Sequence, residues 1–418
     1  FNTALQHHGT MSLGQVLQPA IDYCINGFAV RPRVLGFWLQ PAQAGRIERV
    51  AVVNKLDAAR KIYLSEDGAL LSVGDILKNP DMGRLYQRIA NEGIGIFYDG
   101  DVADLITADM KANGGLLTSD DLVDCAPTNL APLIGNYRGF EVATNQLPGG
   151  GLMILEMLNI LEHFDLAAMG HNSAQYIATV AEAMKYATID KDQFMGDPNF
   201  IDVPRDLLAS KARAAEIAAK IRAGEKADIV RLNSGAPESK DTTHLVVADA
   251  AGNVVNVTHS LGSSSGVITD GLGFMYNNCM MVFDPRPGHV GSLAPGKARF
   301  TAMCPTILSK DGKPFLALGA PGGTTITMGV LQTILNAVDF RMSAQDAVSA
   351  PRFCATSNVI ELTNRILRGV ERDLNQDGYV TRRYAASYIT PILHAIRLQD
   401  GKLDGGADPA GDGMAASC

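Results

Sequence analysis

Two adjacent threonines lie where a polar stretch of the sequence meets a predicted strand. Residues 224–241 are polar and broken by Gly and Pro, whereas residues 244–248 are typical of a strand. Thr242 has two interpretations here, since threonine is also an ordinary strand residue. If its hydroxyl attacked the carbonyl of Asp241, the peptide bond would become an ester that water cleaves. Thr242 would then carry a free α-amine, whose pKa of about 8 suits a general base for its own hydroxyl.

The elements that would position Thr242 are a hairpin after it and a helical region before it. The hairpin is predicted from strands at 244–248 and 254–258, joined by a turn with Gly252 and Asn253. Further short strands are predicted at 273–276, 305–309, 315–319, 358–362 and 392–397. Helices are predicted at 12–27, 107–113, after the cap at 118–121, and at 149–161, 173–187 and 205–223. A helical half, a linker and a strand-rich half are typical either of two domains or of one layered domain cut at the linker.

Composition narrows the class of protein. The 418 residues are 46% hydrophobic and 19% charged, which excludes a disordered chain, a collagen-like repeat and a coiled coil. The formal net charge of −8 gives no reason to expect a nucleic-acid partner. We expect no membrane span, because no uncharged apolar run approaches the ~18 residues that a span needs. Six cysteines without a CxxC pair indicate neither a zinc site nor a disulfide scaffold. The first residues lack the basic-then-apolar pattern of a secretory signal and do not indicate a compartment.

A series of short motifs, in one order along the chain, resembles the γ-glutamyltransferases and their acylase relatives. In the second half these motifs are at 242–244, 252–253, 258–261, 273–278, 283–288, 294–297, 303–306, 319–323, 350–353 and 405–409. In the first half they are at 8–10, 148–152 and 166–197. Because the similarity spans nearly the whole chain, the sequence is identified as a member of this family.

The resemblance implies an α+β fold, the four-layer αββα sandwich of the Ntn hydrolases. It implies a single domain over residues 1–418, cut by the protein itself between Asp241 and Thr242. The products would be a large-subunit-like chain, 1–241, and a catalytic small-subunit-like chain, 242–418, which stay associated. Family members carry a further segment before the region that matches Phe1, including an arginine that binds the substrate carboxylate. We therefore expect that this chain is a fragment, that the given sequence begins late, or that the protein has lost part of a sheet.

The resemblance also implies roles for individual residues. Thr242 would be the nucleophile, and Ser260 would hydrogen-bond its amine or hydroxyl. The backbone N–H groups of Gly322 and Gly323 would form the oxyanion hole, a role that suits glycine because the backbone can approach the substrate closely. The substrate would be a small amide or peptide, and no metal or organic cofactor is expected.

Three positions that should contact the substrate are Cys279, Val282 and Thr301. Val282 stands where γ-glutamyl-specific relatives have an acidic residue for the substrate's α-amino group. An ammonium ion facing Val282 and Cys279 would lose its charge partner, which is costly in a dry pocket. Thr301-Ala302 replaces a serine pair that grips the glutamyl carboxylate, so that one hydroxyl remains. These departures favour a different or less restricted acyl group.

Three functional hypotheses follow. The first is an amidohydrolase or acyltransferase that acts on a γ-glutamyl (glutathione-like) or related acyl amide, with transfer to water or to an amine. The second is an acylase for a non-glutamyl amide of the glutaryl or cephalosporin type. The third is a catalytically inactive, uncleaved homologue that serves as a binding protein.

Overall fold

The computed structural model describes residues 1–40, 48–230, 241–389 and 391–417. These residues form two compact units, of which the smaller contains residues 1–129 and 264–277 and the larger contains residues 130–263 and 278–418. Most of the linker predicted at 224–241 lies outside the described residues. The single-domain organisation implied by the family resemblance stays a prediction.

The smaller unit is mainly helical. Its helices are α1 (Asn2–His8), α2 (Leu13–Asn26), α3 (Pro32–Trp38), α4 (Arg49–Val53), α5 (Asp57–Tyr63), α6 (Pro80–Glu92), α7 (Gly95–Tyr98), α8 (Asp101–Ala112) and α9 (Ser119–Val123). Strands β1 (Phe28–Ala29) and β2 (Ile76–Leu77) pair antiparallel. The predicted caps are confirmed, because Ser12 and Gln15 form a reciprocal capping box at the start of α2 and Gly27, with φ +86°, follows its end. Thr118 caps α9 in the same way.

The strand predicted at residues 273–276 is wrong, because this described segment of the smaller unit is not a strand. Phe274 and Tyr276 pack instead against a cluster that includes Leu85 and Val102 of helices α6 and α8. Gly273 has φ +72°, which lies outside the extended region of the backbone. The hydrophobic residues of this segment therefore belong to a helical core rather than to a sheet.

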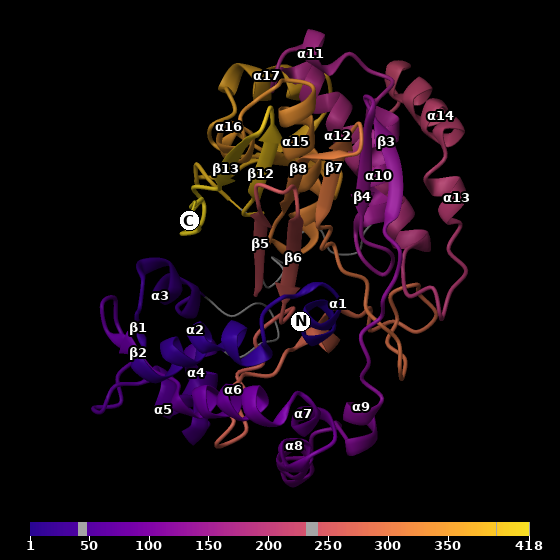
Figure 1. The fold of residues 1–418 in the computed structure, drawn as a ribbon. Coiled ribbons are helices and arrows are strands. Elements are labelled where there is room, and N and C mark those ends of the chain that lie inside the picture. Colours follow the sequence, from indigo (N-terminus) through magenta and orange to yellow (C-terminus); the bar gives the residue numbers. More distant parts are fainter. Residues whose placement is uncertain (41–47, 231–240, 390, 418) are drawn as a thin grey trace. The chain divides into compact units, whose positions relative to one another are not determined.

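The larger unit is built on a six-stranded antiparallel sheet (Figure 1). In spatial order its strands are β13 (Lys402–Ala407), β12 (His394–Gln399), β8 (Lys313–Gly319), β7 (Thr306–Lys310), β4 (Phe140–Thr144) and β3 (Leu133–Tyr137). A second sheet contains β11 (Val380–Arg383), β10 (Val359–Leu362) and β9 (Phe353–Cys354). The strands predicted near 305–319, 358–362 and 392–397 are confirmed. Strands β3 and β4 lie in the half that the sequence predicts to be mainly helical.

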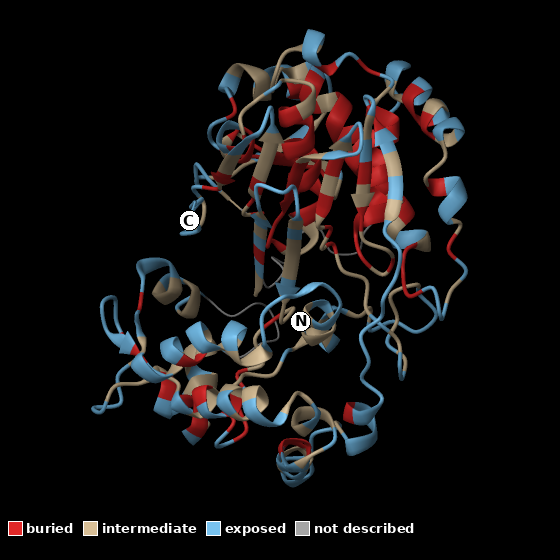
Figure 2. Cartoon of the chain, viewed as in Figure 1, coloured by how far each residue is buried: buried red, intermediate tan, exposed pale blue. Residues whose placement is uncertain are grey.

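Helices cover one face of the six-stranded sheet. The helices of this unit are α10 (Gly151–Leu161), α11 (Leu166–Met169), α12 (Ala174–Phe194), α13 (Arg205–Leu208), α14 (Lys211–Arg222), α15 (Ile326–Val338), α16 (Ala344–Ser349) and α17 (Arg368–Gln376). Every residue of α10 is buried (Figure 2). Leu316 and Leu318 of β8 belong to the same hydrophobic cluster as α10 and α15. Across the described ranges, no helix combines the length and the apolar character needed to cross a membrane.

The hairpin that contains Thr242 lies on the other face of the sheet. Strands β5 (Thr242–Ala248) and β6 (Val254–Ser260) pair antiparallel and pack against β8 and β12. Gly319 points away from the Leu318 face, and a Cβ atom there would lie 2.3 Å from Cε1 of His244. The Nδ2 group of Asn256 donates to the carbonyl oxygens of Thr306 and Leu318, both at 3.0 Å. The described part of this unit is thus a layered α/β structure of hairpin, sheet and helices.

A buried carboxyl group lies inside the helical layer. Glu156 of α10 is 1% exposed, and neither of its carboxyl oxygens has a hydrogen-bond partner among the described residues. Asp190 of α12 is also buried and forms an ion pair with Arg213 of α14. Burial, followed by the nearby Asp190 carboxyl, raises the pKa of Glu156 well above its ordinary value. Glu156 is therefore protonated in the folded protein at pH values where it is ionised in the unfolded chain.

This pKa shift makes stability depend on pH. The folded state binds the extra proton, so the free energy of unfolding falls as pH rises from the unfolded pKa of about 4.3, by up to about 1.4 kcal/mol per pH unit. We expect Glu156→Gln to remove this slope and to be more stable than the parent protein at pH 8. Urea denaturation at pH 5, 6.5 and 8 measures the effect, with exposed Glu141→Gln as the control. Equal pH slopes for the parent and Glu156→Gln would contradict the assignment.

Candidate active site

Thr242 and Ser260 face each other at the open end of the hairpin. Thr242 is the first residue of β5, Ser260 is the last residue of β6, and the two are direct partners in the strand register. Their hydroxyl oxygens lie 2.8 Å apart. Thr242 shares the strand face of His244, which is buried against the sheet, whereas Thr243 is exposed on the opposite face. The structure therefore brings together two of the residues that the sequence predicts to be catalytic.

The register of the hairpin is set by its turn, at the other end from Thr242. Ala248 pairs with Val254, and the turn between them has an Asp249 side chain that accepts from the backbone N–H of Asn253 at 2.9 Å. Gly252 adopts φ +87°, a conformation that favours glycine. The predicted Gly-Asn turn thus fixes which residue of β6 lies opposite Thr242.

The carbonyl group before Thr242 is also hydrogen-bonded. The oxygen of Asp241 accepts from the backbone N–H of Leu261 at 3.0 Å and from Ser260 Oγ at 3.3 Å. The N–H of Gly262 donates to Ser260 Oγ at 2.8 Å. Ser260 Oγ has one proton, so when it donates to Asp241 the Thr242 hydroxyl donates to Ser260. Donors at a carbonyl oxygen polarise the bond and stabilise negative charge that develops on it.

The two glycines of the predicted oxyanion hole form a turn after β8. Gly322 is buried, and a Cβ atom there would lie 2.6 Å from Cβ of Pro391, so only glycine fits. Gly323 has φ +61° and begins a short 3-10 helix, in which Thr325 Oγ1 donates to the oxygen of Gly322 at 2.8 Å. Gly323 lines the same cavity as Thr242, whereas Gly322 is not among its lining residues.

A cavity of about 990 Å³ opens beside the hydroxyl pair. Thr242, Ser260, Val282 and Thr301 all line it. Thr301 is half-buried, and its Oγ1 accepts from the backbone N–H of Met303 at 3.3 Å. Cys279 is not among the described lining residues, and its Sγ donates to the carbonyl oxygen of Leu261 at 3.4 Å. Two of the three predicted substrate contacts therefore reach the cavity directly.

Several charged residues of the cavity do not follow from the sequence reasoning. Lys191 lies 2.5 Å from Asp192, and Arg286 lies 2.6 Å from Asp284. Arg299 lines the same cavity. These residues come from segments far apart in the sequence, so no spacing pattern joins them. The available signal is the family motif series, because the two ion pairs lie within the motifs at 166–197 and 283–288 and Arg299 lies between those at 294–297 and 303–306.

His244 has a structural role in this site. It is 5% exposed, its Nδ1 lies 2.8 Å from Thr258 Oγ1, and its ring stacks on that of His394 with centroids 6.3 Å apart. Burial, with a smaller effect of His394, lowers the pKa of His244 to about 3. The ring is therefore neutral near pH 7 and supports the hairpin from the sheet side.

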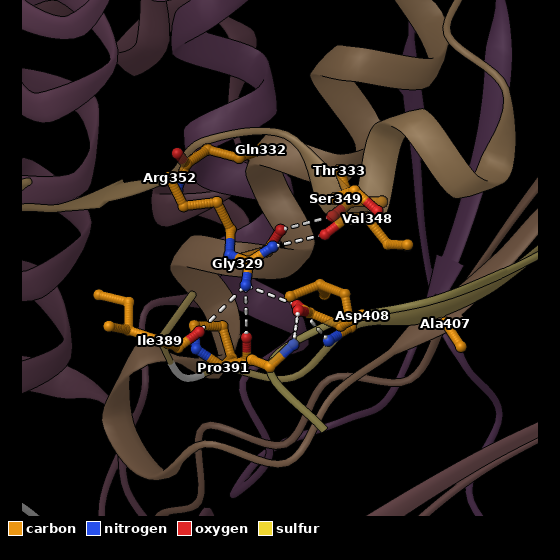
Figure 3. Close-up of polar contacts among 12 residues, drawn as sticks. Gly329, Gln332, Thr333, Val348, Ser349, Arg352, Ile389, Pro391, Ala407 and Asp408 are labelled. Carbon is orange, nitrogen blue, oxygen red and sulfur yellow. Dashed lines mark hydrogen bonds and ion pairs between the residues drawn. The ribbon is translucent and has the colours of Figure 1, made fainter. Parts of the chain in front are cut away.

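A buried ion pair between Arg352 and Asp408 lies beside Ile389 and Pro391 (Figure 3). Arg352 is 4% exposed and Asp408 is 1% exposed, and their side chains lie 2.5 Å apart. Arg352 also donates to the carbonyl oxygens of Ile389 and Pro391, both at 3.0 Å. Pro391 in turn lies against Gly322, and the next residue donates its N–H to the Pro321 oxygen at 2.9 Å. The pair thus braces the turn that carries the two glycines.

The comparisons with known proteins identify the family of this chain. The sequence model of the family described as gamma-glutamyltranspeptidase matches residues 1–418, so the chain belongs to this family. The motif resemblance is therefore confirmed.

Individual relatives are of two kinds. The chain is 37% identical over 418 residues to the acylase ACY 1 proenzyme of Pseudomonas sp. (strain V22), covering 98% of this chain and 72% of the relative. It is 35% identical over 369 residues to the glutathione hydrolase proenzyme of Escherichia coli (strain K12), covering 84% of this chain and 62% of the relative. Its structure is similar to that of a cephalosporin acylase from Bacillus halodurans, with a TM-score of 0.84 and 25% identity over 99% of this chain and 75% of that chain. The mixed α/β fold is thus one that this acylase shares.

Proposed function

We propose that this chain is an N-terminal-threonine amidohydrolase or acyltransferase that cleaves itself between Asp241 and Thr242. The observation that carries the proposal is the hydrogen bonding around this peptide bond. The Asp241 carbonyl oxygen accepts from Leu261 N–H at 3.0 Å, and the Thr242 hydroxyl lies 2.8 Å from that of Ser260. An electrophile and a nucleophile, each with a polar partner, therefore lie on consecutive residues.

Self-cleavage begins when Thr242 Oγ1 attacks the carbonyl carbon of Asp241. The Leu261 N–H stabilises the negative charge on the carbonyl oxygen. The hydroxyl proton passes through Ser260 to the nitrogen of Thr242, and the C–N bond breaks once the C–O bond has formed. Water then hydrolyses the ester, which leaves a carboxylate on Asp241 and a free amine on Thr242.

Turnover repeats the attack on an external amide. The α-amine of Thr242 takes the proton from its hydroxyl, and the N–H groups of Gly322 and Gly323 stabilise the oxyanion. The leaving amine departs with a proton, and the acyl ester on Thr242 is transferred to water or to a second amine. Hydrolysis and transpeptidation thus share the first half of the reaction.

The two products, 1–241 and 242–418, stay associated in this proposal. Strand β4 precedes the cleavage point and β7 follows it, and the two pair from Glu141–Ser309 to Thr144–Thr306. Helices α10 and α15, which likewise come from the two products, belong to one hydrophobic cluster. We further propose the four-layer αββα sandwich as the complete architecture. The support for it is a hairpin on one face of the six-stranded sheet and helices on the other.

The cleavage test uses denaturing electrophoresis of the purified protein. We expect two fragments, the smaller of which begins with Thr242 by Edman sequencing. A single chain that stays intact on incubation would rule out the enzyme and support the binding-protein hypothesis.

The substrate proposal is a small amide whose acyl group is γ-glutamyl or related, with a non-glutamyl acylase as the second candidate. The observation that favours the acylase is Val282, which lines the cavity and offers no charge to a substrate ammonium. An ammonium that faces Val282 is disfavoured by roughly 1–3 kcal/mol, so we expect glutaryl anilide to be cleaved about 10-fold faster than γ-glutamyl anilide at limiting concentration. Acetyl anilide serves as the reference. A strong preference for γ-glutamyl anilide would make this interpretation of Val282 wrong.

A further inference from the structure

One cation of the cavity beside Thr242, Arg299, has no carboxylate partner among the described residues. Lys191 is paired with Asp192, and Arg286 is paired with Asp284. Within the described chain, Arg299 has no carboxylate oxygen within 4.0 Å, and its hydrogen bond is from Nη1 to the Phe300 carbonyl oxygen at 3.2 Å. A guanidinium has five N–H donors, so most of the donors of Arg299 face the cavity or solvent unused.

Arg299 lies close to the hydroxyl pair. Its Nη2 atom is 3.6 Å from the position that a Cβ atom of Gly262 would occupy. The N–H of Gly262 donates to Ser260 Oγ, which is itself 2.8 Å from Thr242 Oγ1. Gly262 has φ +65°, which favours glycine, and a Cβ atom there would also lie 2.7 Å from Cys279 Sγ, so only glycine fits between these groups. Gly262 therefore lies between the Arg299 guanidinium and the hydroxyl pair of Thr242 and Ser260.

Thr301 adds a second donor in the same cavity. Its Oγ1 accepts from Met303 N–H, and no acceptor among the described residues takes its hydroxyl proton. A guanidinium and a hydroxyl are suited to a carboxylate, which accepts two parallel N–H bonds from arginine and a further bond from a hydroxyl. Val282, on the same cavity, offers no partner for an ammonium.

The geometry points to Arg299 as the residue that binds a terminal carboxylate on the acyl group of the substrate. The substrate class is the half-amide of a short dicarboxylic acid, such as a glutaryl amide. This inference rests on the proposed function, because it assigns the acyl side of a substrate that Thr242 attacks. Arg299 and Thr301 together form the anion subsite, and the substrate charge replaces the partner that the arginine lacks.

The test compares Arg299→Met with the parent protein on three anilides. Glutaryl anilide has the carboxylate, glutaramoyl anilide is the same length with a neutral amide, and acetyl anilide has neither. We expect kcat/KM for glutaryl anilide to fall about 10- to 100-fold, with little change for the two neutral substrates. Arg299→Lys should recover part of the loss, because it keeps the charge but not the two parallel donors.

Two controls separate the possible failures. Arg372→Met removes an exposed arginine of α17 that does not line the cavity, and it should leave all three rates unchanged. Cleavage at Thr242, read by Edman sequencing, reports that each variant folds. An equal loss on all three anilides would overturn the inference.

A binding measurement keeps the test independent of turnover. Glutarate titrated into the protein by calorimetry should bind the parent at least about 10-fold more tightly than Arg299→Met, whereas glutaramide should bind neither. If the parent protein cleaves no anilide, the proposed function fails, and the glutarate titration still decides the role of Arg299. Equal glutarate affinity in the parent and the variant would overturn that role.

Discussion

Thr242→Ala is expected to leave the chain in one piece and to lower turnover by roughly 10⁶-fold, the scale seen when a hydrolase loses its hydroxyl nucleophile. The substitution removes the one oxygen that both self-cleavage and substrate attack require. The hydroxyl of Ser260 stays in place, but Ser260 lies on the other strand of the hairpin and does not follow Asp241 in the chain. Denaturing electrophoresis checks the cleavage, and anilide hydrolysis checks the turnover.

Two further variants make this test specific to the Thr242 hydroxyl. Thr243→Ala makes the same change one residue later, at an exposed position on the opposite strand face, and should be cleaved as the parent is. Thr242→Ser keeps a hydroxyl and should retain part of both reactions. Normal cleavage of Thr242→Ala would show that another group is the nucleophile.

Asp408→Asn is expected to cost about 3–5 kcal/mol in the free energy of unfolding. The change leaves the charge of Arg352 without its carboxylate in a position that is 4% exposed. Asp408 also accepts from the backbone N–H groups of Leu393 and Ala410, at 3.1 and 2.8 Å, so its side chain joins several segments. Urea denaturation followed by circular dichroism measures the loss.

The control for this prediction is Asp373→Asn, which makes the same chemical change at an exposed position of α17. It should stay within about 0.5 kcal/mol of the parent. Asp408→Asn should also slow anilide hydrolysis, because Arg352 holds Pro391 against the glycine turn. A stability loss no larger than that of Asp373→Asn would contradict the role of the pair.

Local signals account for the parts of the structure that the sequence predicts well. The capped helix after Ser12 and the hairpin around Gly252 depend on neighbours a few residues away, so their sequence patterns carry the information. The Thr242–Ser260 pair follows from the hairpin, because a turn of known length fixes the register.

Long-range packing accounts for the parts of the structure that the sequence does not predict. Strand β4 pairs with its neighbour β3 and also with β7, more than 160 residues later in the chain, and no local pattern indicates the β7 partner. Residues 273–276 have strand-like side chains but pack into a helical cluster. The position of Arg299 in the cavity depends on where several separate segments meet, which spacing in the sequence does not encode.

The number of residues in and beside the turn at 249–253 decides which residue of β5 lies opposite Ser260. One residue inserted into β5 or deleted from β6 near this turn would place Thr243 opposite Ser260, and the reverse changes would place Asp241 there. Surface turns usually tolerate changes in length, since they lie away from the core. This exposed turn should instead be as intolerant of length changes as a catalytic loop, although none of its atoms meets the substrate.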